Sequence, residues 1–450
     1  MKKELGHEAI YDARTLGMPR MLVLGLQHLF AMFGATVLVP ILVQGYGLPL
    51  SIQTTLLMAG LGTILFHICT KFKVPAFLGS SFVYLGGFST VASLPAYEGV
   101  DAETKLAYAL GGVVVAGLLY LVLAGIIKAV GVKKVMRFLP PVVTGPIIIL
   151  IGLNLAPSAV TNASSCWWLA LVSMAIIVVA NIWGKGMIKI IPILLGIVGS
   201  YVVALIATLC GADLIDFSSV ANAQVVGLQP FALAKFDLNA ILVMAPIAIA
   251  SMMEHIGDMS AISATEGENF IENPGLHRTL IGDGIATSLA GMFGGPANTT
   301  YGENTGVLAL SKVFDPMVVR LAAYFAIILS FCPKFAALIV AMPAATMGGV
   351  SLVLYGMISA VGVRNVVENQ VDFTKSRNVL IAAMIMGLAI GVNYAGSIVI
   401  SMGAITISLS GLAVAAIVGI AMNAILPGKD YEFGTNEQGD TSVNFGPRHD

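Results

Sequence analysis

Apolar segments of about membrane length follow one another along most of this chain, and no other feature limits its fold so strongly. They run from about residue 21 to 426, and no polar stretch between them is long enough for a soluble domain. In lipid, every backbone N–H and C=O must find a partner inside the protein, so such a chain folds into spanning helices. Only 10% of the residues are charged, against about a quarter in soluble domains. The sequence therefore predicts an all-α polytopic membrane protein.

We count fourteen apolar segments, several of them shorter than the roughly 20 residues of a full span. They lie at about 21–42, 50–70, 76–93, 106–130, 138–157, 166–184, 188–210, 238–257, 278–293, 297–311, 316–333, 335–360, 376–394 and 404–426. Residues 1–19 form a polar arm before the first segment, and residues 427–450 form a polar, mildly acidic tail.

The positions of Lys and Arg test this count, because these residues gather in cytoplasmic loops. If fourteen segments cross the membrane and both termini lie inside, all but three of the 23 Lys and Arg fall in cytoplasmic loops. The exceptions are Lys105, Lys235 and Lys334. Dropping one of the first segments would invert every later loop, so we expect fourteen crossings with both termini in the cytoplasm.

Two short segments, 76–93 and 297–311, combine glycines with polar residues and predict interrupted helices. The clearest interruption is the glycine-rich, polar run from Gly294 to Gly306, which also carries a carboxylate at Glu303. Non-helical backbone at membrane depth is tolerated only where it is buried in protein or lines a cavity. In transporters such segments point to the substrate site. The alternative is an ordinary turn outside the membrane.

The chain also resembles itself, since the interruption Gly79–Phe82 parallels Thr300–Glu303 about 220 residues later. Pro141–Thr144 is similar to Pro343–Thr346 in the same way. Seven crossings per half would make the second copy enter the membrane from the opposite side. Two inverted repeats with a broken helix in each place a site at the bilayer midplane. Chance similarity between segments rich in Gly, Pro and Ala is the alternative.

Ionisable residues inside apolar segments are few, and Glu254 and Asp258 lie together at the end of the eighth segment. Residues four apart share one face of a helix. Two carboxylates in a low dielectric tend to hold one proton between them, because both cannot ionise cheaply. A proton-coupled carrier would need such a pair. The alternative is that Asp258 is a solvated residue at the cytoplasmic interface.

Other polar residues in the segments are weaker candidates. Glu303 could pair with a cation for structure, but the nearest one within an apolar segment, Arg320, is expected at its cytoplasmic end, so a neutral substrate that forms hydrogen bonds is the more economical partner. His28 would orient a carboxylate or be an ordinary buried histidine. Tyr301 and Tyr355 offer flat faces for a planar ring, although helix packing explains them as well. We expect Asp283 to lie at the interface.

Catalytic and metal-binding patterns are not found. The four cysteines are scattered without metal or disulfide spacing, and no nucleophile elbow or phosphate loop is present. We therefore expect no enzyme activity, no cofactor and no metal site. The formal net charge of −1 gives no reason to expect nucleic acid as a partner.

Several motifs in both halves resemble the nucleobase–ascorbate transporters, also called nucleobase–cation symporters, and most of all the bacterial uracil permeases. The matching stretches are Gln27–Thr36, Pro75–Phe82, Glu254–Gly257, Pro274–Arg278, Asn298–Gly306 and Gly348–Gly356. They extend over about residues 20–426, and together they are highly specific.

The resemblance implies a division into two domains and the residues of a site. Residues 20–130 and 238–333 would form a core domain, and 138–210 and 335–426 a gate domain, with short strands in the broken third and tenth segments. Uracil would lie between the two domains in a protein that is typically a dimer through its gate domains. Its ring N–H groups would bind Glu254 and Glu303. Backbone at Phe82 and Gly302 would complete its hydrogen bonds, and the pocket would be lined by Tyr301, Ala35, Ser351 and Tyr355.

The resemblance also implies uracil import by proton symport across the cytoplasmic membrane, with Asp258, Glu254 and His28 as candidates for coupling. Where the best-known uracil permease pattern has histidine four residues after the helix glutamate, this chain has Asp258, so the coupling detail is open. Serine at 311 replaces the usual threonine of the signature. Glutamate at 303 is typical of pyrimidine carriers, whereas xanthine and urate carriers usually have glutamine. A xanthine or other purine–proton symporter is the near alternative, and an anion transporter of similar architecture is the distant one.

Overall fold

The computed structural model describes residues 9–396, 398–402, 405–428 and 431. Within these ranges, the side chains of residues 190, 303, 310, 368, 400–402 and 405–408 lie outside the description. The N-terminal eight residues and most of the expected tail at 427–450 are therefore outside the part described.

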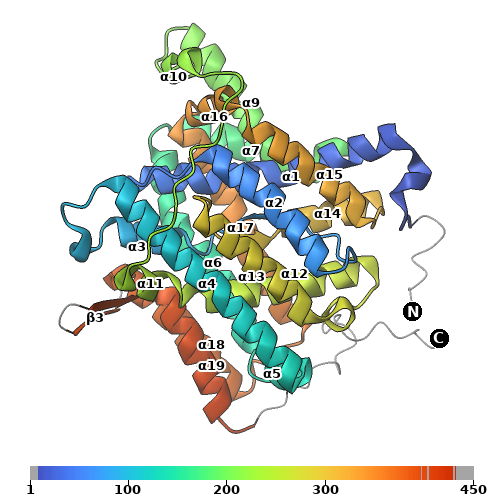
Figure 1. The fold of residues 1–450 in the computed structure, drawn as a ribbon, viewed down its shortest axis with the longest axis vertical. Helices are drawn as coiled ribbons and strands as arrows, with labels where there is room; N and C mark the ends of the chain where they lie inside the picture. The colour runs from blue at the N-terminus through green and yellow to red at the C-terminus, as the bar shows by residue number, and fades with distance from the viewer. Residues whose placement is uncertain (1–8, 397, 403–404, 429–430, 432–450) are drawn as a thin grey trace.

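The helices and strands of Figure 1 fall into two groups by their contacts, and five short helices lie between or before them along the chain. The first group holds α1 (Met18–Gly45), α2 (Ile52–Cys69), β1 (Leu78–Ser80), α3 (Leu85–Ala92), α4 (Ala102–Val130), α11 (Leu238–Met244), α12 (Ile247–Glu266), α13 (Leu276–Met292), β2 (Asn298–Thr300), α14 (Gly302–Ser311) and α15 (Pro316–Ser330). The second group holds α6 (Pro141–Ser164), α7 (Trp167–Trp183), α8 (Met187–Ile190), α9 (Pro192–Leu209), α16 (Pro333–Val340), α17 (Ala344–Glu368), α18 (Ser376–Ala395), β3 (Ile398–Met402), β4 (Ile405–Leu409) and α19 (Gly411–Ile425). The five short helices are η1 (Ala13–Leu16), η2 (Pro95–Tyr97), α5 (Val132–Met136), α10 (Ser218–Asn222) and η3 (Ile271–Gly275), of which α5 and α10 connect one group with the other.

Two short strands replace helix in the middle of the first group, where the sequence predicts interruptions. β1 and β2 pair antiparallel, with Gly79 opposite Thr299. A threonine on a neighbouring helix binds the backbone of each strand in the same way. Thr63 on α2 accepts from the Leu78 N–H at 2.9 Å, and Thr287 on α13 accepts from the Asn298 N–H at 3.2 Å. The backbone groups of β1 and β2, which lie outside any helix, thus form their hydrogen bonds with other parts of the protein.

Contacts between helices recur in the two halves of the chain. In the first half, α1 and α2 both pack on α15. Their counterparts in the second half, α11–α12 and α13, both pack on α4. In the second group, α7 contacts α9 and α17, while α18 contacts α19 and α6. Figure 1 shows α18 and α19 side by side, with the β3–β4 hairpin projecting beyond them.

Helix α17 lies along α6, and this packing fixes the positions of residues on its inner face. At Gly152 of α6 the two backbones approach so closely that a Cβ would lie 2.1 Å from the Tyr355 carbonyl oxygen. Ser351 and Tyr355 of α17 are buried, with exposed fractions of 0% and 1%.

The N-terminal arm packs against the first group from residue 9 onward. Ile10 forms a bridge with Val313, just after α14. The Ala13 N–H donates to Asp315 Oδ2 at 2.8 Å. The N-terminus of α1 and the C-terminus of α14 therefore lie at the same end of the molecule.

Two expected helix boundaries are wrong. The eighth segment does not end near residue 257: after a break at Ala245–Pro246, α12 continues to Glu266 and stops at Gly267, which has a left-handed backbone. The twelfth segment, expected at 335–360, is not one helix, because α16 ends at Val340 and α17 begins at Ala344. The residues before α17 are as apolar as those within it, so hydropathy alone does not show where the chain turns.

Within the described residues, eight helices are long and apolar enough to cross a membrane, or nine if α15 and α16 count as one bent span. Further apolar helices, α7 and α19, are shorter, with 17 and 15 residues. Large apolar side chains are exposed on the outside, among them Trp183 at 69% and Leu209 at 79%. The protein is a mostly helical, multi-pass membrane protein with short strands.

Candidate functional site

Tyr301 ties the two strands together at the centre of the first group. Its hydroxyl donates to the Ser80 carbonyl oxygen at 2.9 Å and accepts from the Thr36 hydroxyl at 3.3 Å. The ring crosses β1 at Gly79, where a Cβ would lie 2.3 Å from the tyrosine Cζ. Only glycine permits this approach. The ring, at 3% exposed, is thus part of the packing as well as a candidate wall of the pocket.

Glu254 and Asp258 lie on the face of α12 that meets β2. The Thr299 hydroxyl donates to Glu254 Oε2 at 3.4 Å, and the Thr300 hydroxyl donates to Asp258 Oδ2 at 2.9 Å. Asp258 is only 9% exposed and eight residues before the end of α12. It is therefore not a cap at a helix end. Two carboxylates one turn apart in a buried setting repel each other, and one shared proton relieves this repulsion.

The N-termini of two half-helices begin at the strands. Tyr84 precedes α3 and Tyr301 precedes α14, and neither makes a side-chain capping hydrogen bond. The first turn of a helix has N–H groups without intrahelical partners. Gly302 opens α14 as an exposed residue, and a Cβ there would lie 3.8 Å from Asp258 Oδ1. These donors are suited to bind carbonyl oxygens of a ligand placed between the half-helices and α12.

Glu303 belongs to the first turn of α14, directly after Gly302. Its side chain lies outside the described part of the structure. Its backbone directly follows Gly302, where a Cβ would lie 3.8 Å from Asp258 Oδ1.

Aromatic and small residues from both groups meet beside the strands. Phe82 follows β1, and its ring meets the edge of the Tyr355 ring with 5.8 Å between centroids and 77° between planes. Ala35 on α1 is fully buried. Ser351 donates to the Met347 carbonyl oxygen at 2.6 Å, which leaves its oxygen lone pairs as acceptors. The predicted pocket residues thus come from both helix groups, and Phe82 of the first group meets Tyr355 of the second.

His28 couples α1 to α14. The Asn304 amide donates to the His28 carbonyl oxygen at 3.1 Å and lies 3.1 Å from His28 Nδ1. Because the amide nitrogen is the donor, Nδ1 is the acceptor, and the imidazole proton lies on Nε2. That Nε2 is buried and has no hydrogen-bond partner among the described residues. The histidine is thus held against the half-helix that carries Glu303.

The sequence reasoning missed a second buried pair, His255 and Asp283. Their side chains are 0% exposed, and Nδ1 lies 2.9 Å from the Asp283 carboxylate, while Nε2 lies 3.0 Å from the Thr279 hydroxyl. The expectation that Asp283 is interfacial is therefore wrong. Small residues on both sides, Gly282 and Gly284, were a usable signal, because such residues mark a helix face packed closely on its neighbours.

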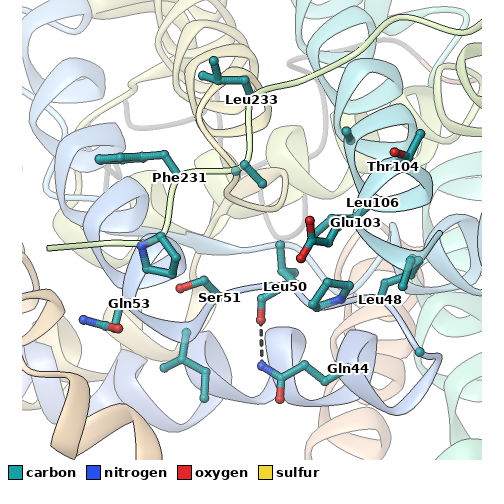
Figure 2. A pocket seen from close by; sticks show the side chains of 18 of the residues that line it. Gln44, Leu48, Leu50, Ser51, Gln53, Glu103, Thr104, Leu106, Phe231 and Leu233 are labelled. Atoms are coloured by element: carbon teal, nitrogen blue, oxygen red, sulfur yellow. Dashed lines mark hydrogen bonds between the residues drawn. The ribbon is translucent and has the colours of Figure 1, made fainter. Parts of the chain in front are cut away.

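A broad hollow lies at the end of the first group opposite the N-terminal arm, near the C-terminus of α1 (Figure 2). The described residues that line it include none of the predicted site residues. Its volume is about 1010 Å³, and it lies between the start of α2, the start of α4 and the extended chain at 230–235. Gln44 donates to the Leu50 carbonyl oxygen at 2.7 Å along its floor. No group of three or more metal-ligating side chains occurs in the described residues.

Comparison with known proteins identifies relatives along most of the chain. The model of the permease family Xan_ur_permease matches residues 19–398. The uracil permease of Bacillus caldolyticus is 41% identical over 440 residues, which cover 93% of this chain and 94% of that protein. The uracil permease of Escherichia coli (strain K12) is 36% identical over 413 residues, which cover 89% and 90%.

Solved structures with the same fold are more distant in sequence. The transmembrane domain of the cyanobacterial bicarbonate transporter BicA matches with a TM-score of 0.58 and 17% identity, over 92% of this chain and 99% of that one. SLC26A9 matches with a TM-score of 0.63 and 11% identity, over 92% and 66%. At such identities these matches show a common fold and nothing finer.

Proposed function

The chain belongs to this permease family, as its motifs indicated, and we propose that it imports uracil together with a proton across the cytoplasmic membrane. One observation carries the proposal: two carboxylates of α12 face the paired half-helix ends in a chain about 40% identical to uracil permeases. Membership in a permease family makes the protein a transporter and not an enzyme.

Uracil fits the donors and acceptors around β1 and β2. The base has two ring N–H groups and two carbonyl oxygens on one small ring. Glu254 and Glu303 would accept from the N–H groups, and backbone N–H groups at Phe82 and Gly302 would donate to the carbonyl oxygens. An ionised carboxylate can only accept hydrogen bonds, so these two residues need a ligand that donates hydrogen bonds.

The walls of the site would then select a flat ring. Phe82 and Tyr355 meet edge to face, and Tyr301, Ala35 and Ser351 would close the remaining sides. All three rings provide apolar faces, and the two tyrosines also carry a polar hydroxyl.

Fourteen spans in two inverted repeats are our proposal for the architecture. The recurring contacts support it, because α1 and α2 pack on α15 as α12 and α13 pack on α4, and α7 packs on α9 as α18 packs on α19. Thr63 and Thr287 support it as well, since they bind β1 and β2 in the same manner. The first helix group would be the core domain (20–130 and 238–333), and the second would be the gate domain (138–210 and 335–426). We further propose that core moves against gate, that two copies join through their gates, and that both termini are cytoplasmic.

Proton coupling would use Asp258 next to Glu254, with His28 as the remaining candidate. A proton moving down 100 mV supplies about 2.3 kcal/mol, which suffices to accumulate a neutral base. The buried position of Asp258 against Thr300 supports a role beyond solvation.

Two alternatives have different substrates. A purine–proton symporter would share the architecture, and glutamate at 303 favours the pyrimidine instead. The solved relatives include anion transporters by name, but carboxylates at the half-helix ends disfavour an anion, since buried like charges repel.

The experiment is uptake of labelled uracil by proteoliposomes with and without an inward proton gradient, competed by unlabelled uracil, thymine, cytosine, xanthine and bicarbonate. We expect uracil to compete best and the gradient to increase accumulation. Stronger competition by xanthine would favour the purine alternative.

A further inference from the structure

A smaller cavity of about 160 Å³ lies between the two helix groups. Phe30 and Ala31 of α1 and Gly306 of α14 line it on one side, and Asn181 of α7 lines it on the other. Lys189 of α8 also lines it and is exposed. None of these residues belongs to the site described above.

On both α1 and α14, the residue that lines the cavity lies one helical turn away from a residue of the site. Ala31 is four residues before Ala35 on α1, and Gly306 is four residues after Gly302 on α14. Each cavity residue is therefore displaced by about 6 Å along the helix axis from the site residue on the same helix. Both steps lead toward the end of the molecule where the N-terminal arm contacts the end of α14. Met357, two residues beyond Tyr355 on α17, also lines the cavity.

The size and lining of the cavity limit what it can hold. A cavity of about 150 Å³ in another protein accepts a benzene molecule, so this space fits one six-membered ring. Phe30 offers an apolar face. The Asn181 side-chain amide has both a donor and an acceptor, which match the adjacent carbonyl and N–H of a pyrimidine edge.

We propose that this cavity, here called the inner cavity, is a second, transient site through which the base passes after it leaves β1–β2. The inference rests on the proposed function, because it takes the pyrimidine base as the transported ligand. The base can bind at β1–β2 without entering the inner cavity. It must pass through the inner cavity to reach the end of the molecule where the N-terminal arm lies.

Gly306 gives a direct way to fill the inner cavity. A Cβ at this position meets no atom within 4 Å, so a larger side chain enters the space without displacing backbone. Variants Gly306→Ala, Gly306→Val and Gly306→Phe form a graded series. Gly125→Phe on α4 is the matched control, because Gly125 is also an exposed helical glycine with no atom near its Cβ.

Uracil binding to each purified variant and uracil counterflow in proteoliposomes are measured side by side. We expect binding affinity to stay within about threefold throughout, while counterflow falls stepwise and drops more than about tenfold for Gly306→Phe, since release steps limit carriers of this kind as they limit many enzymes. Gly125→Phe should resemble the wild type in both measurements.

Other outcomes contradict the proposal. Wild-type counterflow in Gly306→Phe would mean that the base does not pass through the inner cavity. Parallel loss of binding and counterflow would make Gly306 part of the first site and remove the need for a second one. A wild-type protein that binds no uracil would instead contradict the proposed function itself, and the inference with it.

Discussion

Glu254 and Asp258 face β2 one helical turn apart, and each accepts a hydrogen bond from a threonine hydroxyl. We expect different consequences when each is neutralised. Asp258→Asn should keep uracil binding but make transport insensitive to the pH gradient and leave exchange intact, because the amide cannot carry the proton. Glu254→Gln should damage binding and transport together, because it replaces an acceptor that touches the base. Binding and gradient-driven uptake of the two variants decide between these roles.

Asp372→Asn is a control for the charge change, because Asp372 lies in an exposed loop and bonds only locally in its described contacts. If Asp258→Asn still concentrates uracil in response to external acid, Asp258 does not carry the proton. Coupling would then have to lie in Glu254, Glu303 or His28.

Glu303 is the second proposed acceptor for the ring N–H groups. Glu303→Gln places an amide where an acceptor-only carboxylate stood, and a site with an unmatched polar group rejects its ligand strongly. We expect uracil binding to fall at least about a hundredfold while the protein still inserts and folds. Size-exclusion profiles and equilibrium binding check this, with Glu98→Gln in an exposed loop as the control. Near-wild-type affinity would remove Glu303 from the site.

Single residues also show how far the sequence alone leads. Glu254 and Asp258 were identifiable because they are charged residues four apart in an apolar segment. The pair of His255 with Asp283 was not, since the partners lie 28 positions apart on different helices and meet only through packing. Only the likeness to a family suggested Ser351 and Phe82 as pocket residues, which no periodicity distinguishes from core residues.

The strands β1 and β2 are the elements on which the site depends, and Gly79 permits their arrangement. A methyl group at Gly79 would overlap the Tyr301 ring. We expect Gly79→Ala to displace that ring, break its hydrogen bond to Ser80 and lower uracil affinity by about tenfold or more, since cores resist added volume. Binding assays and the near-UV tyrosine signal check this.

Gly86→Ala on α3 is the matched control, because a Cβ there meets no atom within 4 Å. Equal affinities of the two alanine variants would show that the approach of Tyr301 to β1 does not matter for the site.

Helix interruptions were predictable where glycine and polar residues coincide, as at Gly79 and Gly302. Helix ends were less so. The eighth segment extends to Glu266 because polar residues of α12 are buried against other helices, which hydropathy does not register. The 88° turn between α15 and α16 falls at the predicted boundary between two segments, but the break between α16 and α17 lies in the apolar stretch 335–360 and was not predicted.

At the scale of the whole molecule, the proposed fourteen crossings place both termini in the cytoplasm. The distribution of Lys and Arg predicts this orientation. Reporter fusions after residue 430 should be active on the inside, and fusions near Val100 should be active on the outside. The reverse result at either position would mean that the number of crossings is wrong.

The coupling of uracil to protons is the central claim, and the most direct test measures the protons themselves. Proteoliposomes with a pH-sensitive dye inside and no imposed gradient receive external uracil. Proton symport predicts internal acidification with the wild-type protein, none with Asp258→Asn, and none when uracil is omitted. Uracil entry by the wild-type protein without any change in internal pH would contradict it.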